Sequence, residues 1–356
     1  MTLRVVFLSD WLGNPYKRLL ADHLNQEGIE VKEYFRRNFF LPEVFQFIGV
    51  GNPGILHLHT LHPFLLGRNP LFQLLKILLF ISQLFILKLS GISTVWTVHE
   101  WSNKLGSNRH DLSPKTIKVL SRFINGFITH CPSTQAEIAA SFAVPDRVCT
   151  IPHGNYIGTY ENTISPAQAR AELGIPAADL TFLLFGSIYY YKGYLEAIDA
   201  FQQIHPDRVR LIVAGNPQEA GLHEKLLARA QENDAIQLIL KRIPDDEIQL
   251  YMNAADCVIV PYKVFTTSGI AILAMSFGRA CIAPNVGFFS DMLDESGSFL
   301  YDADHSDGIR HAMKVAIEQR NQIAAMGDHN LALAKQWNWN FVAKETVNVY
   351  RKCLDH

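Results

Sequence analysis

The chain has 356 residues, of which 48% are hydrophobic and 19% are charged. This length suits two domains, and the apolar content excludes a disordered chain. The net charge of −2 hides an asymmetry: residues 1–160 carry 15 Lys and Arg against 10 Asp and Glu, and residues 161–356 carry 17 against 24. We therefore expect the first half to face the more anionic partner, and we expect no nucleic-acid partner.

The cysteines are few and scattered. The chain contains five of them and no CxxC pair, which is typical of reduced, buried thiols in a cytosolic protein. The first ten residues, MTLRVVFLSD, run directly into a predicted strand and lack the features of a signal peptide. We expect a cytoplasmic protein.

Short β-rich runs alternate with helical stretches along the first half. This alternation favours a parallel sheet with helices on both faces. Strands are predicted at Leu3–Ser9, Val31–Phe35, Ile55–His59, Ser93–His99, Gly126–His130 and Val148–Pro152, and helices near 16–26, 71–89, 114–124 and 134–142.

The predicted helix at 71–89 is unusually apolar. Its sequence, LFQLLKILLFISQLFILKL, has 14 apolar residues in 19 and nearly reaches transmembrane length. On a helical wheel its glutamines and lysines (Gln73, Lys76, Gln83 and Lys88) fall within one face of roughly 140°. Two interpretations stay open: a crossover helix packed on a sheet, or a helix lying in a membrane interface. A membrane span is disfavoured because the segment sits inside an alternating strand–helix pattern.

The second half repeats the alternation. Two such sheets predict two Rossmann-like, doubly wound domains of the α/β class, and the cleft between them is the expected ligand site. We place the domains at 1–160 and 161–338, and we expect residues 339–356 to form a helix that crosses back to the first domain. Strands are predicted at Thr181–Gly186, Arg210–Ala214, Ile236–Leu240, Cys257–Val260, Ala280–Ala283 and Ser298–Tyr301.

The stretch VIVPYKVFTTSG predicts a buried strand, a loop and the start of a helix. Thr266, Thr267, Ser268 and Gly269 lie at that start. First-turn amides have no partners inside a helix and carry partial positive charge, so with a hydroxyl and a glycine they suit a phosphate. The alternative is that Ser268 is an ordinary N-cap.

Two further strand ends carry comparable loops. In FLLFGSIYYYKG a strand ends at Gly186, and Lys192–Gly193 is predicted to open a helix. A lysine there is unfavourable unless an anion is near; the alternative is a solvated surface lysine. The strand in LIVAGNP ends before Asn216. Three such loops at one sheet edge indicate a nucleotide diphosphate lying across the second domain.

The ordered set LHLHTLHPFLLG, VWTVHE, IPHGNYIGTY, FGSIYYYKG, AGNP, LYMNAADCVIVPYK and TSGIAILAMSFGRACIAP covers nearly the whole chain. It resembles the GT-B-fold glycosyltransferases of bacterial exopolysaccharide and lipid-linked sugar assembly, most of all the xanthan-type GDP-mannose:glycolipid 4-β-mannosyltransferases. The resemblance implies an acceptor in the first domain, a donor in the second, and no metal or cofactor. It implies donor contacts from His153, Gly186, Ser187, Lys192, Gly193, Asn216, Ile243, Tyr262, Thr267, Ser268 and Gly269.

The chain also departs from many retaining relatives. They carry an arginine where this chain has Ser187, and two glutamates eight residues apart where it has residues near Phe265 and then Leu273. These departures agree better with the inverting mannosyltransferase-like group. Inversion needs a general base on the acceptor side.

The candidate base lies in VWTVHEW. His99 and Glu100 follow a first-domain strand, and His99 has the more useful pKa; Asp10, after the first strand, is a third candidate, and a structural role for His99 stays open. Acceptor contacts are expected from Asp10, Asn14, Tyr16, His59 and His62. The histidines in LHLHTLH do not indicate a metal site, because no Cys or carboxylate lies close by in sequence.

These features predict a metal-independent hexosyltransferase that moves a sugar from a nucleoside diphosphate donor, GDP-mannose or a UDP-sugar, to a lipid-linked or polysaccharide acceptor. The basic first half and the apolar 71–89 helix favour a peripheral position on the inner face of the plasma membrane. Two alternatives stay open. One is a nucleotide-sugar epimerase or hydrolase on the same fold, and the other is a non-catalytic subunit that binds nucleotide sugar.

Overall fold

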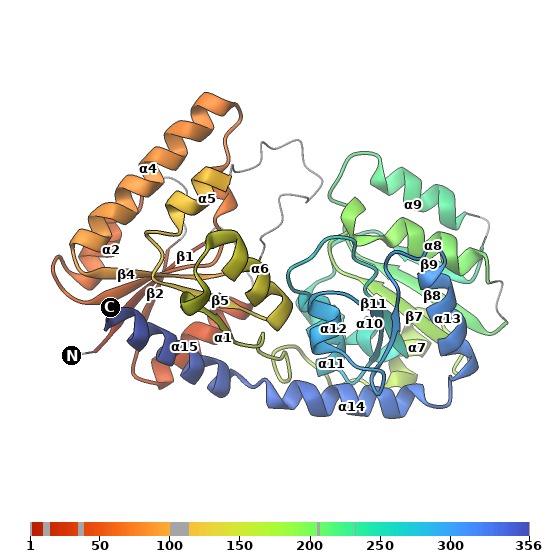
Figure 1. The fold of residues 1–356 in the computed structure, drawn as a ribbon. Helices are drawn as coiled ribbons and strands as arrows, with labels where there is room; N and C mark the ends of the chain where they lie inside the picture. Colours follow the sequence, from red (N-terminus) through yellow and green to blue (C-terminus); the bar gives the residue numbers. More distant parts are fainter. Residues whose placement is uncertain are drawn as a thin grey trace. The chain divides into compact units, whose positions relative to one another are not determined.

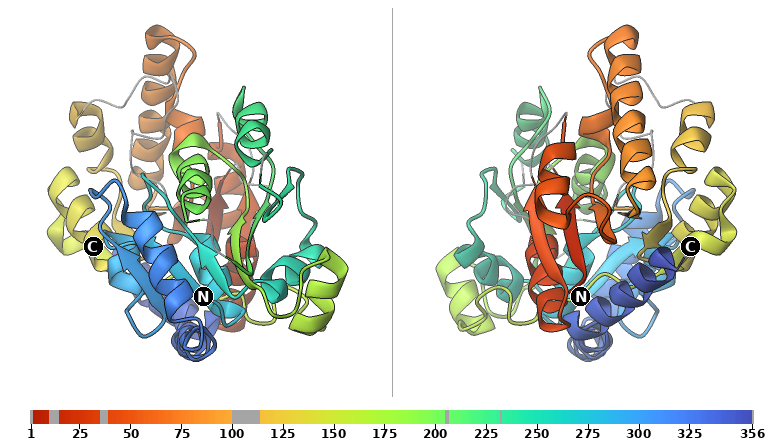
Figure 2. Two further views of the ribbon diagram at one scale, coloured as in Figure 1. Left: turned by 90° about the vertical axis from the view of Figure 1, so that its right-hand side faces the viewer. Right: turned by 90° about the vertical axis from the view of Figure 1, so that its left-hand side faces the viewer.

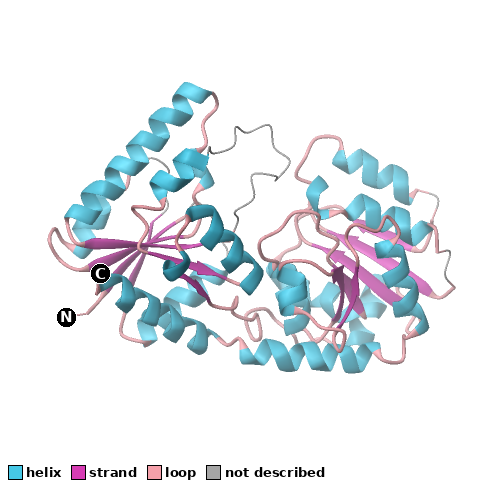
Figure 3. Cartoon of the chain, viewed as in Figure 1, coloured by secondary structure: helices cyan, strands magenta, loops and turns pink. Residues whose placement is uncertain are grey.

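The chain forms two compact units, which the computed structural model describes over residues 2–9, 15–34, 39–99, 114–204, 207–231 and 233–355. Unit 1 comprises Met1–Gly154 and Asn338–His356, and unit 2 comprises Asn155–Trp337 (Figure 1). Each unit contains a six-stranded, all-parallel sheet flanked by helices (Figure 3). The expected α/β class with two doubly wound parallel sheets is therefore confirmed.

The sheet of unit 1 has the strand order β2-β1-β3-β4-β5-β6. Its strands are β1 (Arg4–Leu8), β2 (Glu30–Tyr34), β3 (Gly54–Leu58), β4 (Ile92–Thr97), β5 (Gly126–Thr129) and β6 (Val148–Thr150). Its helices are α1 (Pro15–Gln26), α2 (Leu41–Ile48), α3 (His62–Leu65), α4 (Pro70–Leu89), α5 (Pro114–Leu120), α6 (Pro132–Phe142) and α15 (Trp339–Leu354), with a 3-10 turn, η1 (Pro145–Arg147).

Both faces of this sheet are buried, as parallel sheets require. Along β1, Val6 and Leu8 point into a core shared with α2, α4 and α6. Val5 and Phe7 alternate with them and point into a second core shared with α1 and α15. The last helix therefore covers one face of the sheet of unit 1.

The sheet of unit 2 has the strand order β12-β11-β10-β7-β8-β9. Its strands are β7 (Leu180–Phe185), β8 (Val209–Ala214), β9 (Ile236–Ile239), β10 (Cys257–Ile259), β11 (Ala280–Pro284) and β12 (Ser298–Tyr301). Its helices are α7 (Pro166–Leu173), α8 (Tyr194–Gln202), α9 (Leu222–Ala230), α10 (Ile248–Ala254), α11 (Gly269–Ser276), α12 (Phe288–Met292), α13 (Gly308–Glu318) and α14 (Ile323–Gln336), with 3-10 turns η2 (Tyr190–Lys192) and η3 (Asp245–Glu247).

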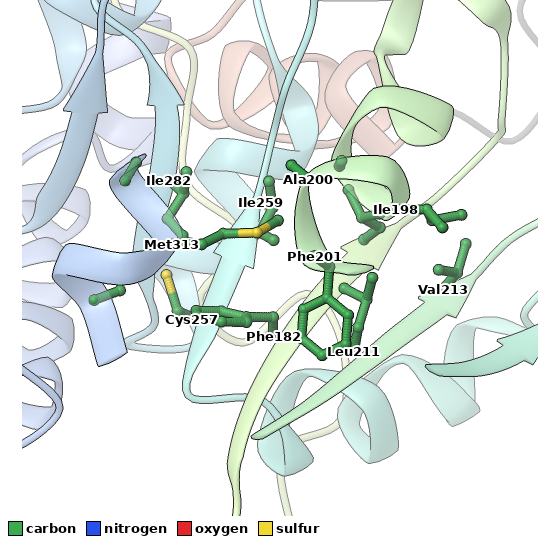
Figure 4. Packing of buried hydrophobic residues seen from close by; sticks show 14 of the residues in the cluster. Phe182, Ile198, Ala200, Phe201, Leu211, Val213, Cys257, Ile259, Ile282 and Met313 are labelled. Atoms are coloured by element: carbon green, nitrogen blue, oxygen red, sulfur yellow. The ribbon is translucent and has the colours of Figure 1, made fainter. Parts of the chain in front are cut away.

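The core of unit 2 interlocks strand and helix side chains. Phe182 of β7 and Leu211 of β8 pack with Phe201 of α8, and Met313 of α13 lies near Cys257 of β10 (Figure 4). All of these side chains are fully buried. This packing fixes the central strands, and with them the loops that leave their carboxyl ends.

The predicted strands agree with the observed ones to within two residues at each end, whereas three helices and the domain boundary differ from the predictions. The sequence patterns predicted neither α2 nor α3, and the helix predicted at 114–124 ends at Leu120. Unit 1 ends at Gly154 before the chain enters unit 2, whereas the sequence placed this domain boundary at residue 160.

Helix α4 (orange in Figures 1 and 2) connects two adjacent parallel strands, β3 and β4. By length and composition alone, it is the one helix in the described part of the chain that could cross a membrane. One stripe of it packs into the core of unit 1.

Candidate functional site

Three loops of unit 2 meet at one edge of its sheet. Strands β10, β7 and β8 are neighbours, so the loops that follow their carboxyl ends lie side by side. Gly186 is the first residue after β7, and Gly215 is the first after β8. Their backbones are in direct contact, since a Cβ added to Gly215 would lie 1.8 Å from the carbonyl oxygen of Gly186. The contact continues where the Ile188 amide donates to the Asn216 carbonyl at 2.9 Å. Only glycines allow two chains to approach so closely.

Two more glycines set the shape of this edge. Gly186 has φ +102°, and a Cβ there would lie 3.0 Å from the side chain of Ile270 in the first turn of α11. Gly193 has φ +70°, and its Cβ would lie 2.1 Å from the carbonyl oxygen of Pro261. The two glycines therefore allow close packing, of Gly186 against the Ile270 side chain and of Gly193 against the backbone of Pro261, that a side chain at either position would prevent.

The start of α11 has a side-chain cap and also keeps polar groups that can bind a ligand. The hydroxyl of Ser268 accepts from the Ala271 amide at 3.2 Å, so the N-cap interpretation of Ser268 is correct. The neighbouring Thr267 Oγ1 is buried and has no hydrogen-bond partner among the described residues. One cap leaves other first-turn amides unsatisfied, so the two interpretations of this helix start are compatible.

Lys192 does not open a helix, contrary to the prediction. It ends the 3-10 turn η2, and α8 begins at Tyr194 because Gly193 in the left-handed region separates the two. Lys192 Nζ donates to the Ser187 carbonyl at 2.8 Å. It also lies 5.3 Å from the ring centre of Tyr262.

Tyr262 connects this ammonium to the start of α11. Its hydroxyl is hydrogen-bonded to Ser268, and burial raises its pKa well above the ordinary value, so the phenol stays neutral. Lys192, Ser187, Tyr262, Ser268 and Gly269 thus belong to one constellation of cation, hydroxyls and amides. An anion suits it better than a cation does.

Other predicted donor residues lie farther along the edge. Asn216 follows β8, and Ile243 lies between β9 and η3. Sequence analysis missed Glu219, whose carboxylate accepts from the Tyr190 amide at 2.6 Å and so holds the η2 loop. A separate cavity of about 360 Å³ is lined by residues such as Arg210 and Asp234, which lie at the opposite, amino edge of the sheet, where parallel sheets seldom bind ligands.

In unit 1, histidines gather at the carboxyl edge of the sheet. His59, His99, His130 and His153 follow the neighbouring strands β3, β4, β5 and β6 in turn. His59 Nδ1 lies 3.4 Å from His99 Nε2, and His99 Nδ1 lies 3.3 Å from His130 Nε2. The side chain of Tyr16 covers the row, with its ring centre 4.6 Å from that of His99. Sequence analysis missed His130 and the row as a whole, although the recurrence of His after four consecutive strands was a signal that could have found it.

Burial keeps these rings neutral. It lowers the pKa of His153 to about 3 and that of His130 to about 4 from the ordinary 6.5. Burial, with repulsion among the rings as a smaller cause, also lowers the pKa of His59 and of His99 well below 6.5. Desolvation disfavours each charged form, so at neutral pH the row is a set of uncharged hydrogen-bonding groups.

His57 has a structural role. Its Nδ1 lies 2.6 Å from the Tyr350 hydroxyl of α15, and its Nε2 lies 2.7 Å from Thr97 Oγ1. No group of three or more His, Cys, Asp or Glu suited to a metal ion occurs in the described part of the chain. The predicted residues Asp10, Asn14 and Glu100, and the side chain of His62, lie outside the described residues.

The predicted site residues therefore lie in two places. Unit 2 brings together Gly186, Ser187, Lys192, Gly193, Tyr262, Ser268 and Gly269 at the carboxyl edge of its sheet. Unit 1 holds His59, His99, His153 and Tyr16 in its histidine row. His153, predicted to contact the donor, is only 4% exposed, and its Nδ1 donates to the Gly154 carbonyl of unit 1 at 2.7 Å.

The chain is similar in sequence to known glycosyltransferases. Residues 167–330 match the model of the family Glycosyl transferases group 1. A D-inositol 3-phosphate glycosyltransferase of Corynebacterium urealyticum is 25% identical over 194 residues, 52% of this chain and 46% of that protein, so the match spans about half its length. A GDP-mannose:glycolipid 4-beta-D-mannosyltransferase of Xanthomonas campestris pv. campestris is 24% identical over 306 residues, 84% of this chain and 79% of that protein.

Solved structures show the same fold. The sucrose-phosphate synthase of Thermosynechococcus elongatus superposes with a TM-score of 0.77 at 16% identity, covering 98% of both chains. The Anabaena protein HepE, solved with UDP-glucose, superposes with a TM-score of 0.71 at 16% identity, covering 97% of this chain and 98% of that one. The fold is therefore GT-B, as in these two solved structures.

Proposed function

We propose that this protein is a group 1 glycosyltransferase that moves a hexose from a nucleoside diphosphate donor, GDP-mannose or a UDP-sugar, to a lipid-linked or polysaccharide acceptor in exopolysaccharide assembly. The proposal assigns the donor to unit 2 and the acceptor to unit 1. It needs no metal ion. Two similarities support the choice of donor: one relative is named as using GDP-mannose and a glycolipid, and one solved neighbour holds UDP-glucose.

The observation that carries the proposal is the constellation at the start of α11. The ammonium of Lys192, the amides that follow Ser268 and the buried hydroxyl of Thr267 are donors or a fixed positive charge. The leaving group in sugar transfer is a nucleoside diphosphate, on which negative charge increases as the glycosidic bond breaks. Groups placed to meet that charge lower the barrier, and they do so without a divalent ion.

The acceptor hydroxyl must lose a proton as it attacks the sugar carbon. We assign the general base to the residues that follow β4, His99 or Glu100. His99 is neutral because burial lowers its pKa, so its ring is in the form that accepts a proton. Its contacts with His59 and His130 give that proton neighbours to which it can pass.

The test is Lys192→Ala in a transfer assay with candidate donors. We expect turnover to fall by about 10²–10³, since the loss of one preorganised donor at a developing charge typically has that effect. The matched control is Lys225→Ala, because Lys225 also lies against a tyrosine of the same loop, 4.8 Å from the Tyr190 ring centre, but outside the constellation. Turnover of Lys192→Ala within about twofold of wild type would contradict the assignment.

The same assay separates the alternatives. Donor consumption without any acceptor would indicate a hydrolase or epimerase. Donor binding with no turnover on any acceptor would indicate a non-catalytic nucleotide-sugar-binding subunit, which the missing glutamates favour. Turnover that survives EDTA would support the metal-independent form, and its loss would contradict it.

A further inference from the structure

Helix α4 turns both of its glutamines toward the core of unit 1. Gln83 is buried, and its Oε1 accepts from the Phe40 amide at 2.8 Å. Gln73 is also buried, and Lys76 Nζ donates to the Leu66 carbonyl at 2.9 Å. The polar stripe therefore binds the backbone of unit 1, whereas in a helix that faces water this stripe would point outward.

The opposite face of α4 is apolar and exposed. Among the described residues, 16 large hydrophobic side chains are exposed, and nine of them lie on this one helix. At 3.6 residues per turn the nine fall within an arc of about 160°. We call this set the apolar arc; it consists of Leu71, Phe72, Leu74, Leu75, Leu78, Leu79, Phe85, Ile86 and Leu89.

The apolar arc offers almost nothing polar to a protein partner. Its one polar residue is Ser82, whose hydroxyl donates to the Leu79 carbonyl of the same helix. Protein interfaces normally carry about one hydrogen bond per 100–200 Å². A convex surface of leucine, phenylalanine and isoleucine without free donors or acceptors fits the acyl region of a lipid bilayer better.

The charges beside the arc fit the headgroups of an anionic bilayer. Residues 44–99, which include all of α4, contain no Asp or Glu. Lys88 and Arg122 are exposed at the last turn of α4, where Lys88 Nζ donates to the Arg122 carbonyl at 3.1 Å and Phe85 contacts Phe123. Lys118, four residues before Arg122 in the chain, is also exposed. Basic residues at the edge of a buried apolar face are attracted to anionic lipids.

We propose that α4 docks unit 1 on the surface of an anionic phospholipid bilayer, with the apolar arc in the acyl boundary and the three basic residues among the headgroups. The helix lies in the interface and does not span it, because its inner stripe packs in the core of unit 1 between parallel strands β3 and β4. This docking is independent of the proposed reaction. If that reaction is correct, docking brings the active site to a lipid-linked acceptor on the inner face of the plasma membrane.

The test is cosedimentation of the full chain with vesicles of phosphatidylcholine alone or with about 30% phosphatidylglycerol, without donor or acceptor. We expect binding to the anionic vesicles at least about tenfold tighter than to the neutral ones at low salt. The double variant Leu75→Gln and Leu78→Gln should weaken binding to anionic vesicles at least about tenfold. The matched control is Leu227→Gln, an exposed leucine on α9 of unit 2.

Lys118→Gln with Arg122→Gln should weaken binding to anionic vesicles without changing the weak binding to neutral ones. Circular dichroism of each variant checks its fold, and the substituted side chains are all exposed. The proposal is overturned if wild type does not bind anionic vesicles, or if the leucine variant binds them as wild type does. It is also overturned if light scattering shows a dimer without lipid that the leucine variant dissociates, since the arc would then cover a second copy of the chain.

Discussion

Acid should destabilise unit 1 through its buried histidines. Each ring has a folded pKa below the ordinary 6.5, because burial disfavours its charged form. The unfolded chain therefore binds more protons than the folded chain between the two pKa values, and the free energy of unfolding falls as the pH falls below 6.5. The free energy of unfolding of unit 1 is therefore unaffected by these rings above pH 6.5, and it falls progressively toward acid pH.

The magnitude follows from the three rings whose pKa burial lowers to about 3 or 4. His57 and His153 titrate at about 3 and His130 at about 4. Between pH 8 and pH 5 each ring lowers the free energy of unfolding by about 2 kcal/mol, and the three together by about 6 kcal/mol. His59 and His99 act in the same direction. Domains are typically stable by about 5–15 kcal/mol, so unit 1 should approach its unfolding transition near pH 5.

Urea unfolding at pH 8 and pH 5 measures this change, with hydrogen–deuterium exchange of peptides from each unit to assign it. His130→Gln should reduce the pH-dependent loss by about 2 kcal/mol, because glutamine does not take up a proton. His223→Gln, at an exposed position on α9, controls for the substitution itself. A loss in unit 1 below about 1 kcal/mol between the two pH values would refute the reasoning.

Two predictions concern the carboxyl edge of the sheet of unit 2, where we propose that the donor binds. Gly193→Ala should lower the free energy of urea unfolding by about 3 kcal/mol, because the new methyl group clashes with the Pro261 carbonyl and alanine disfavours the positive φ. Gly174→Ala is the control: it has φ +69° but no atom within 4 Å of the added methyl group, so it should lower this free energy by only about 1 kcal/mol. Equal losses in the two variants would argue against the clash. Thr267→Val should leave the free protein as stable or more so, because it removes a buried unpaired hydroxyl. It should raise the calorimetric Kd for the nucleotide donor about tenfold, and an unchanged Kd would show that the hydroxyl does not bind it.

The strands were predictable because each parallel strand is a short β-branched or aromatic run bounded by turn residues. The short helix α2 was not, because its N-cap is Phe40, which gives no side-chain cap. The wheel of α4 correctly grouped Gln73 and Gln83 on one face. It could not show that this face turns inward, because their partners, such as the Phe40 amide, lie far away in sequence.

The candidate site also has parts that the sequence could predict and parts that it could not. Glycines and hydroxyls at strand ends indicated the edge of unit 2 that we propose as the donor site, since their local chemistry is visible in the sequence. The environment of His57 was hidden, because its partner Tyr350 lies 293 residues along the chain. The register of Lys192 was misjudged by two residues, because the sequence does not distinguish a 3-10 turn from the first turn of a helix.

The return of α15 to unit 1 has a consequence for synthesis. The ribosome completes all of unit 2 before it makes the helix that covers Val5, Phe7 and Ile55. Domains generally fold as they emerge, so the unit begun first matures last. Until then the part of this face that α1 does not cover stays bare and apolar, a binding surface for chaperones during translation.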